Sequence, residues 1–217
     1  WKRYLNLISF CLNLSIQLVL RIIFSLSNFN KPKLIIASSP QLPAAFITLV
    51  ICKIFKIPMI FEVRDIWPQI LIDMDNMSER SLTYKVLKKM ERILYRNSEL
   101  IIALSKGSIK YIQSEGGREI DFFPNYSNTD LFKYSSLPLE DSKFSSTRPF
   151  RIIYSGAHGV ANDLANVVKA AYFLQDLPIE IILVGDGPEK NNLQKLSQKL
   201  ENVFFQDPIP KKDMPEL

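Results

Sequence analysis

Histidine and cysteine are scarce in this chain of 217 residues, which contains one His and two Cys. Structural zinc sites are built from clustered Cys and His ligands, and the sequence has neither a Cys cluster nor an Asp-x-Asp pair near a predicted strand end. It also lacks the Gly-x-Ser-x-Gly elbow that is typical of α/β-hydrolases. These absences argue against a metal site and against Ser–His–Asp hydrolysis, so we expect a protein that works without a metal.

Charge of either sign is limited and spread along the chain. The 27 Lys and Arg residues exceed the 22 Asp and Glu residues, but they form no dense basic block and are not interleaved with aromatic residues. This excess favours an anionic ligand or an acidic membrane surface and falls short of a nucleic-acid-binding signature. Cys11 and Cys52 lie in apolar helical patterns, which predicts buried free thiols and a cytoplasmic protein.

Residues 4–29 form the most apolar segment. A membrane-spanning helix needs about 20 predominantly apolar residues, but here a polar stripe consists of Asn6, Ser9, Asn13, Gln17 and Arg21. The opposite face consists of Leu5, Ile8, Leu12, Ile16, Val19 and Ile23. The pattern predicts an amphipathic helix whose apolar face packs on a sheet. Contact with a membrane surface is the alternative, because Lys2, Arg3 and Arg21 are basic.

Apolar runs and helical patterns then alternate along the chain. Strands are predicted over 31–40, 58–65, 99–105, 119–125, 151–157, 179–187 and 202–206. Helices are predicted over 43–55, 79–97, 106–115, 162–175 and 188–200. Buried strands that alternate with helices are typical of parallel sheets with helices on both faces. The sequence therefore predicts an α/β fold.

Residues 133–149 interrupt this alternation and are rich in Ser, Pro and charge, which is typical of a linker. The linker separates an N-terminal domain, 1–132, from the start of a C-terminal domain, 150–217. We expect two Rossmann-like domains that face each other across a cleft. The chain opens at Trp1 without an initiator Met and stops where a helix is predicted to begin, so we expect truncation at both ends and two incomplete domains.

Polar residues follow several predicted strands, and ligands of open parallel sheets bind outside the carboxyl ends of the strands. Ser38 and Ser39 follow one strand, and Glu62, Arg64 and Asp65 follow the next. Burying three charged side chains at the end of a strand costs desolvation free energy unless they form ion pairs or bind a ligand. They are either an ion-paired turn or part of a binding cleft.

Two glycine turns, SGAHGVANDL and VGDGPEK, each connect a predicted strand to a predicted helix. Gly156 and Gly159 allow the backbone to approach a ligand closely, and a helix N-terminus attracts phosphate. Gly185 and Gly187 are candidates for lining the cleft. The alternative for Gly156 is a tight turn without a ligand. His158 lies in the first turn, which makes it a candidate for ligand contact.

Six motifs occur in order from residue 31: IIASSPQ, FEVRDIWP, FPNYSNTDLF, YSGAHGVAND, LVGDGPEK and NVFFQDPIPKKDMPEL. Together they resemble family-4 retaining glycosyltransferases of the GT-B fold, and most of all bacterial surface-polysaccharide enzymes that include N-acetylfucosamine transferases. The resemblance implies metal-independent transfer of a sugar from a UDP-sugar donor with retention of configuration. It also implies a polyprenyl-linked saccharide acceptor, a donor site in the C-terminal domain and work at the inner face of the plasma membrane.

The resemblance also implies roles for single residues. Arg64 and Asp65 match the family's His-Asp pair and are the expected catalytic residues, with Asp65 as the acid nearest to the transfer. The expected donor-binding residues are Gly156, His158, Gly185, Gly187, Ile209 and Pro210. The expected residues of the acceptor-side cleft are Ser38, Ser39 and Glu62. The family's basic pair after the first donor-domain loop has no counterpart, since no Arg or Lys occurs between His158 and Lys169.

Two other functions remain open at this stage. A UDP-sugar 2-epimerase shares the two-domain fold, but it needs more acids and histidines in its cleft than a chain with a single His offers. A non-enzymatic two-lobed binding protein would have the same architecture. Binding of UDP against other nucleotides is the first measurement that separates these functions.

Overall fold

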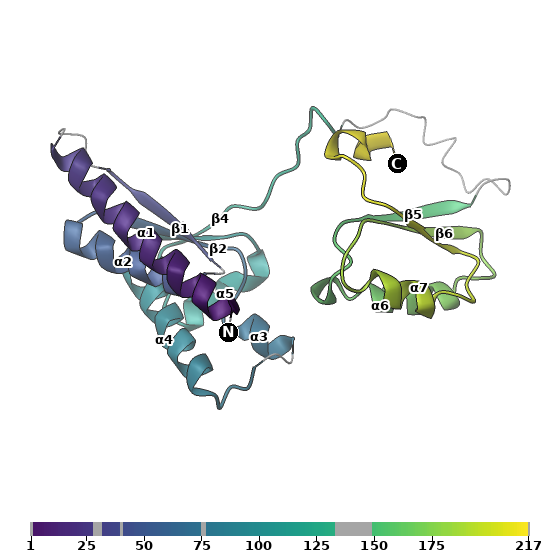
Figure 1. The fold of residues 1–217 in the computed structure, drawn as a ribbon, viewed down its shortest axis with the longest axis horizontal. Helices are drawn as coiled ribbons and strands as arrows, with labels where there is room; N and C mark the ends of the chain where they lie inside the picture. The colour runs from purple at the N-terminus through teal and green to yellow at the C-terminus, as the bar shows by residue number, and fades with distance from the viewer. Residues whose placement is uncertain (1, 28–31, 40, 75–76, 133–148, 217) are drawn as a thin grey trace. The chain divides into compact units, whose positions relative to one another are not determined.

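The computed structural model describes residues 2–27, 32–39, 41–74, 77–132 and 149–216. The chain divides into two compact units, Trp1–Tyr126 and Ser127–Leu217, and each has its own parallel sheet (Figure 1). The predicted linker 133–149 lies outside the described residues except for Pro149. The predicted boundaries of the two domains therefore stay predictions.

Strand order equals chain order in the first unit, where the described residues form the sheet β1-β2-β3-β4. The strands are β1 (Ile35–Ser38), β2 (Met59–Val63), β3 (Leu100–Ala103) and β4 (Ile120–Phe122). The helices are α1 (Lys2–Ser27), α2 (Leu42–Phe55), α3 (Gln69–Asp73), α4 (Leu82–Asn97) and α5 (Lys106–Ser114). The α/β alternation predicted from the sequence is thus present, and α3 is an element that the prediction missed.

One face of this sheet carries the core. Alternate strand residues such as Ala37, Phe61 and Ile101 are buried against side chains of α2, α4 and α5. On the other face, Ile36 is 60% exposed. The expectation of helices on both faces is therefore wrong for the described part of this unit. Right-handed crossovers between strands that always step in one direction put every connecting helix on the same side.

Helix α1 packs beside α2 through a different face from the predicted one. Cys11 and Ile22 are buried, and Ile22 packs with Ile51 of α2. The predicted packing residues are exposed, except for the partly buried Val19: Leu5, Ile8, Leu12, Ile16 and Ile23 are 51–61% exposed. Helix α1 carries two apolar stripes roughly a third of a turn apart. The sequence of the helix alone does not show which stripe packs against α2.

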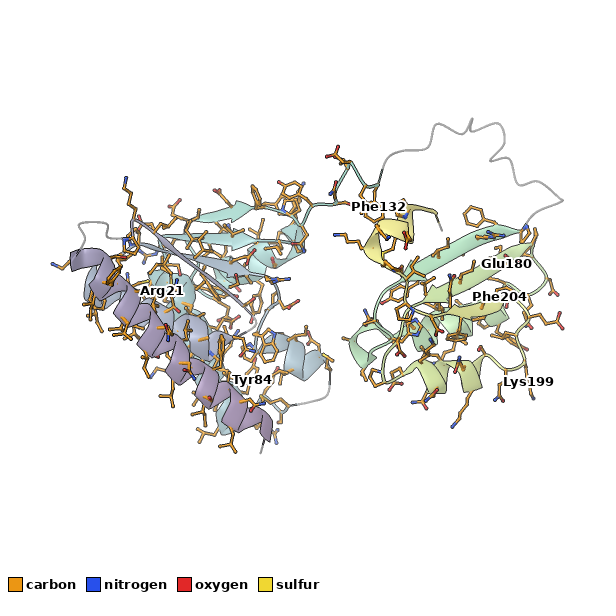
Figure 2. All side chains as sticks on the ribbon, turned by 45° about the horizontal axis from the view of Figure 1, so that its top comes forward. Arg21, Tyr84, Phe132, Glu180, Lys199 and Phe204 are labelled. Carbon is orange, nitrogen blue, oxygen red and sulfur yellow. The ribbon has the colours of Figure 1, made fainter. Side chains whose placement is uncertain are left out.

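The stretch Leu5–Ser25 of α1 is also long and apolar enough to cross a membrane by length and composition alone. It has 21 residues and a mean hydropathy of 2.0, and 11% of it is buried. Its polar stripe includes Arg21, which Figure 2 labels on this helix. Both cysteines are free and buried, as predicted, and burial raises the pKa of the Cys11 and Cys52 thiols.

A charge cluster joins α4 to α5 on the core side of the first unit. Lys88 Nζ lies 2.8 Å from a carboxylate oxygen of Glu91 and 2.8 Å from one of Glu115, and Arg92 Nε lies 2.6 Å from Glu115. Burial acts to raise the pKa of Glu115, but hydrogen bonds from Lys88 and Arg92 outweigh it and leave that pKa lowered. Glu91 is fully buried, and loss of water raises its pKa despite Lys88. One turn before Lys88 on α4, Tyr84 (Figure 2) donates a hydrogen bond to Gln69 Oε1 of α3 at 3.1 Å.

The second unit repeats the arrangement with the sheet β5-β6-β7. Its elements are β5 (Phe150–Ser155), a 3-10 helix (Val160–Asn162), α6 (Leu164–Tyr172), β6 (Ile179–Val184), α7 (Lys190–Leu196), β7 (Val203–Gln206) and a second 3-10 helix (Lys211–Glu216). Helices α6 and α7 cover one face of this sheet (Figure 1). Glu180 and Phe204 lie on the opposite face (Figure 2), which again lacks a covering helix among the described residues.

Candidate functional site

The first group of candidate residues lies at the carboxyl ends of β1 and β2. Ser38 and Glu62 are paired in register across the two strands, and the Ser38 hydroxyl donates a hydrogen bond to Glu62 Oε2. Ser38 is exposed and Glu62 is half-buried. This pair therefore presents a hydroxyl and a carboxylate at the strand ends, and its place in an acceptor-side cleft stays a prediction.

Ser39 turns the other way and is 3% exposed. Its hydroxyl oxygen accepts hydrogen bonds from the backbone N–H of Arg64 at 2.9 Å and of Asp65 at 3.2 Å. It also lies 3.3 Å from the carbonyl oxygen of Asp65, to which it donates. The prediction of Ser39 as a cleft-lining residue is therefore wrong for its side chain, because that side chain is occupied by the turn after β2.

Arg64 and Asp65 are both exposed, so the charged residues after β2 are not buried as the sequence suggested. Among the described residues, no salt bridge joins Arg64, Asp65 or Glu62 to a partner. The alternative of an ion-paired turn is thus not found there. Within the described residues the Asp65 carboxylate has no ion-pair partner, and it lies after β2, where a polar ligand of an open parallel sheet would approach.

The second group lies at the carboxyl ends of β5 and β6, around a pocket of about 240 Å³. Its lining consists of Ser155, Gly156, Ala157, Val184, Gly185, Asp186, Pro208, Ile209 and Met214. Hollows also lie along α7 and between α1 and β1, away from the paired carboxyl ends of β5 and β6. The pocket at β5 and β6 is therefore the candidate for a ligand of this unit.

Close backbone approach builds the floor of this pocket. The Gly156 N–H donates to the Val184 carbonyl at 3.0 Å, and the Gly185 N–H donates to the Gln206 carbonyl at 3.0 Å. Gly187 has a φ of +159°, and a Cβ there would lie 2.5 Å from the His158 carbonyl oxygen. The glycines of VGDGPEK are therefore required by the backbone itself. For Gly156 an added Cβ would meet the Tyr154 hydroxyl at 2.8 Å, which is the movable end of a side chain.

His158 lies behind the pocket rather than in it. Its ring is fully buried between Tyr154 and Phe205, with ring centroids 6.2 and 6.1 Å away. Burial lowers the pKa of His158, and the nearby charge of Lys190 lowers it further. Both effects favour the neutral imidazole over the charged one. Its backbone still shapes the site, since its N–H donates to the Asp186 carbonyl at 2.9 Å.

Lys190 contacts the backbone of the second glycine turn. Its Nζ donates to the Gly185 carbonyl at 3.0 Å and to Asp207 Oδ1 at 2.7 Å. The Lys190 side chain is 15% exposed and that of Asp207 is 93% exposed. This hydrogen bond lowers the pKa of Asp207. Lys190 therefore stabilises the backbone of Gly185, which lines the pocket.

The structure gathers some of the predicted donor-binding residues and leaves others aside. Gly156, Gly185 and Ile209 line the pocket, whereas Gly187, His158 and Pro210 are not part of its lining. Sequence reasoning missed Ser155, Pro208 and Met214 as lining residues. Ser155 ends β5, so the strand-end rule used for Ser38 would have found it.

Metal ligands are not clustered in the described part of the chain. No group of three or more His, Cys, Asp or Glu side chains there could hold a metal ion. Metal independence itself stays a prediction.

Two parallel α/β units with strand-end sites describe the fold of GT-B glycosyltransferases, and solved structures of that type match this chain. The predicted α/β fold class is thus confirmed. No family model matches the chain. The matched structures extend well beyond it, since the chain spans about half of their length.

Three of these structures illustrate the likeness. Anabaena Alr3699/HepE in complex with UDP and glucose matches with a TM-score of 0.58 and 17% identity over 88% of this chain and 52% of that chain. Sucrose-phosphate synthase from Thermosynechococcus elongatus matches with a TM-score of 0.62 and 15% identity over 84% and 47%. The lipopolysaccharide outer core galactosyltransferase WaaB matches with a TM-score of 0.51 and 13% identity over 95% and 50%.

Among curated proteins, the chain is similar to WcaI of Escherichia coli K12, which is named as a colanic acid biosynthesis glycosyl transferase. The two are 30% identical over 129 residues, which is 53% of this chain and 30% of WcaI. The motif-based resemblance to glycosyltransferases of this fold therefore has support from sequence similarity as well as from structure.

Proposed function

We propose that the whole protein is a glycosyltransferase that uses a UDP-sugar donor. The observation that carries this proposal is the pocket at the ends of β5 and β6, whose floor is backbone and whose rim includes Ile209. Backbone at strand ends is suited to a diphosphate, and an apolar rim residue is suited to a nucleobase. HepE, which shares the fold, is described in complex with UDP-glucose and with UDP.

In this proposal the two units divide the work. Gly156 and Gly185 approach the diphosphate, and Ile209 contacts the base. In the first unit, Ser38, Glu62 and Asp65 face the acceptor. The attacking hydroxyl has to be oriented and has to lose its proton, and the free Asp65 carboxylate can do both. We further propose that transfer retains the anomeric configuration, needs no metal and moves a hexosyl or N-acetylhexosaminyl group.

The proposed acceptor is a polyprenyl-linked saccharide of bacterial surface polysaccharide synthesis, handled at the inner face of the plasma membrane. The relative WcaI is named for colanic acid biosynthesis. The free apolar stripe of α1 supports peripheral membrane contact, because Leu5, Ile8, Leu12 and Ile16 are all more than half exposed. A helix of this kind buries its apolar face at the boundary between headgroups and acyl chains.

Calorimetric titration of the whole protein with UDP, GDP and ADP tests the donor site. UDP is expected to bind most tightly, and Ile209→Ala is expected to weaken UDP by about tenfold, the effect of about 1.4 kcal/mol. Leu196→Ala is the matched control, because Leu196 is an apolar residue of α7 that is 48% exposed and outside the pocket. Equal effects of the two variants would contradict this placement of the base.

The two other functions give different readouts. An epimerase converts UDP-N-acetylglucosamine to its 2-epimer without an acceptor, whereas a transferase releases UDP and needs one. A binding protein releases no UDP from any donor. Analysis of nucleotide products with and without extracted bacterial lipids as acceptor therefore separates the three.

A further inference from the structure

The turn after β2 occupies all three hydrogen-bonding sites of the Ser39 hydroxyl. A serine hydroxyl has one donor and two acceptor sites, and here they meet the N–H of Arg64, the N–H of Asp65 and the carbonyl of Asp65. A residue at the end of β1 thus holds the chain that leaves β2. Its side chain is 3% exposed, so it does not itself reach a ligand.

Asp65 is fixed at both of its backbone polar groups. Its N–H and its carbonyl both meet Ser39, and the carbonyl also accepts from the Trp67 N–H at 3.0 Å. Trp67 packs against the core of the unit, and Pro68 is fully buried. The turn is therefore anchored on two sides, while the Asp65 side chain is exposed.

A free carboxylate on an immobilised backbone is what an acceptor-orienting group needs, because a reacting hydroxyl has to be held in one geometry. We infer that Ser39 is a positioning residue: it holds the turn that sets the Asp65 carboxylate for transfer. The inference rests on the proposed function. It assigns to Ser39 a role through Asp65 and not through contact with the acceptor.

Ser39→Ala removes the hydroxyl and leaves the turn without its anchor. With UDP release from UDP-glucose and UDP-N-acetylglucosamine as the assay, and extracted bacterial lipids as acceptor, kcat of the whole protein is expected to fall by about 10²-fold. KM for the donor is expected to stay unchanged, because the donor pocket lies in the other unit. Ser39→Thr retains the hydroxyl and is expected to restore most of kcat. Ser39→Cys has a similar size but a weak acceptor and is expected to behave like Ser39→Ala.

Ser108→Ala is the matched control for stability. Ser108 is 7% exposed and its hydroxyl donates to the Ser105 carbonyl at 2.7 Å, so its loss also removes a buried hydroxyl from the same unit. A lowered melting temperature with normal kcat is expected for this variant. If Ser39→Ala shows the same profile, Ser39 is scaffold and the inference is wrong.

The double variant Ser39→Ala, Asp65→Asn decides how Ser39 acts. If Ser39 works through Asp65, the double variant has the same kcat as Asp65→Asn alone. Additive losses would show an independent role and overturn the inference. Normal kcat of Asp65→Asn alone would remove the role of Asp65, and absence of UDP release by the wild type would remove the proposed function. Each failure is therefore recognisable by itself.

Discussion

A Cβ atom on Gly185 would lie 1.9 Å from the carbonyl oxygen of Gly156, so these two strand ends approach each other too closely for any side chain. Gly185 also has a φ of +145°, which side chains rarely allow. The glycine is thus a requirement of the fold of the second unit before any ligand is considered. Its presence in a glycine turn does not by itself indicate a binding site.

Gly185→Ala is expected to destabilise the protein by about 3 kcal/mol or more, because strained backbone and a steric clash act together. Gly159→Ala is the control: its Cβ would meet only Asn162 Oδ1 at 3.4 Å, and its φ of −106° is ordinary. That variant is expected to stay within about 0.5 kcal/mol of the wild type. Urea unfolding followed by circular dichroism measures both, and similar losses would contradict the steric argument.

Asp65→Asn keeps the size of the side chain and removes its charge. As the acceptor-orienting acid, Asp65 is expected to account for about 10²-fold or more of turnover. The melting temperature is expected to stay unchanged, because Asp65 is exposed and has no salt bridge within the described residues. Asp176→Asn, at an exposed acid before β6, is the control for loss of a surface charge. Unchanged turnover in Asp65→Asn would leave Asp65 without a catalytic role.

The α4–α5 charge cluster predicts a dependence of stability on pH. The folded pKa of Glu115 is lowered, so its contribution is fully present above its ordinary pKa of 4.5 and is lost as pH falls through the folded value. Glu115→Gln is expected to cost about 1–2 kcal/mol at pH 7 and nothing in strong acid, where the wild type has lost the same interaction. Urea unfolding at a series of pH values measures the difference, and a difference that is constant with pH would contradict the argument.

The free apolar stripe of α1 predicts binding to lipid vesicles. Leu12 and Ile16 are 59% and 57% exposed, and replacing both by Ser is expected to lower the fraction bound to phosphatidylglycerol-containing vesicles by about tenfold. The control replaces Leu82 and Val86 of α4, which are 77% and 45% exposed. Co-sedimentation measures the bound fraction. Equal losses in both double variants would indicate unspecific adsorption. A stable dimer without vesicle binding would indicate that the apolar stripe of α1 packs against a second copy of the chain instead.

The alternation of strands and helices was predictable because buried parallel strands such as Leu100–Ala103 are continuous apolar runs. The strand-end rule also named Ser38, Glu62 and Asp65, which lie at the carboxyl ends of β1 and β2 and whose role in a site stays a prediction. It failed for Ser39, since adjacent residues of a strand point to opposite sides and only the fold shows which of two neighbouring serines turns inward. It also failed to separate His158 from the pocket lining, because the burial of a ring depends on neighbours, such as Phe205, that are distant in the sequence.

Strand order that equals chain order has a consequence for how the protein is made. Each strand pairs with the one synthesised just before it, β1 with β2, β2 with β3 and β5 with β6. Contacts between neighbours in sequence close short loops and form early, and chains fold from the N-terminus while they are being translated. Each sheet can therefore lengthen one strand at a time at the ribosome, and the first unit can complete β1–β4 before β5 has left the exit tunnel.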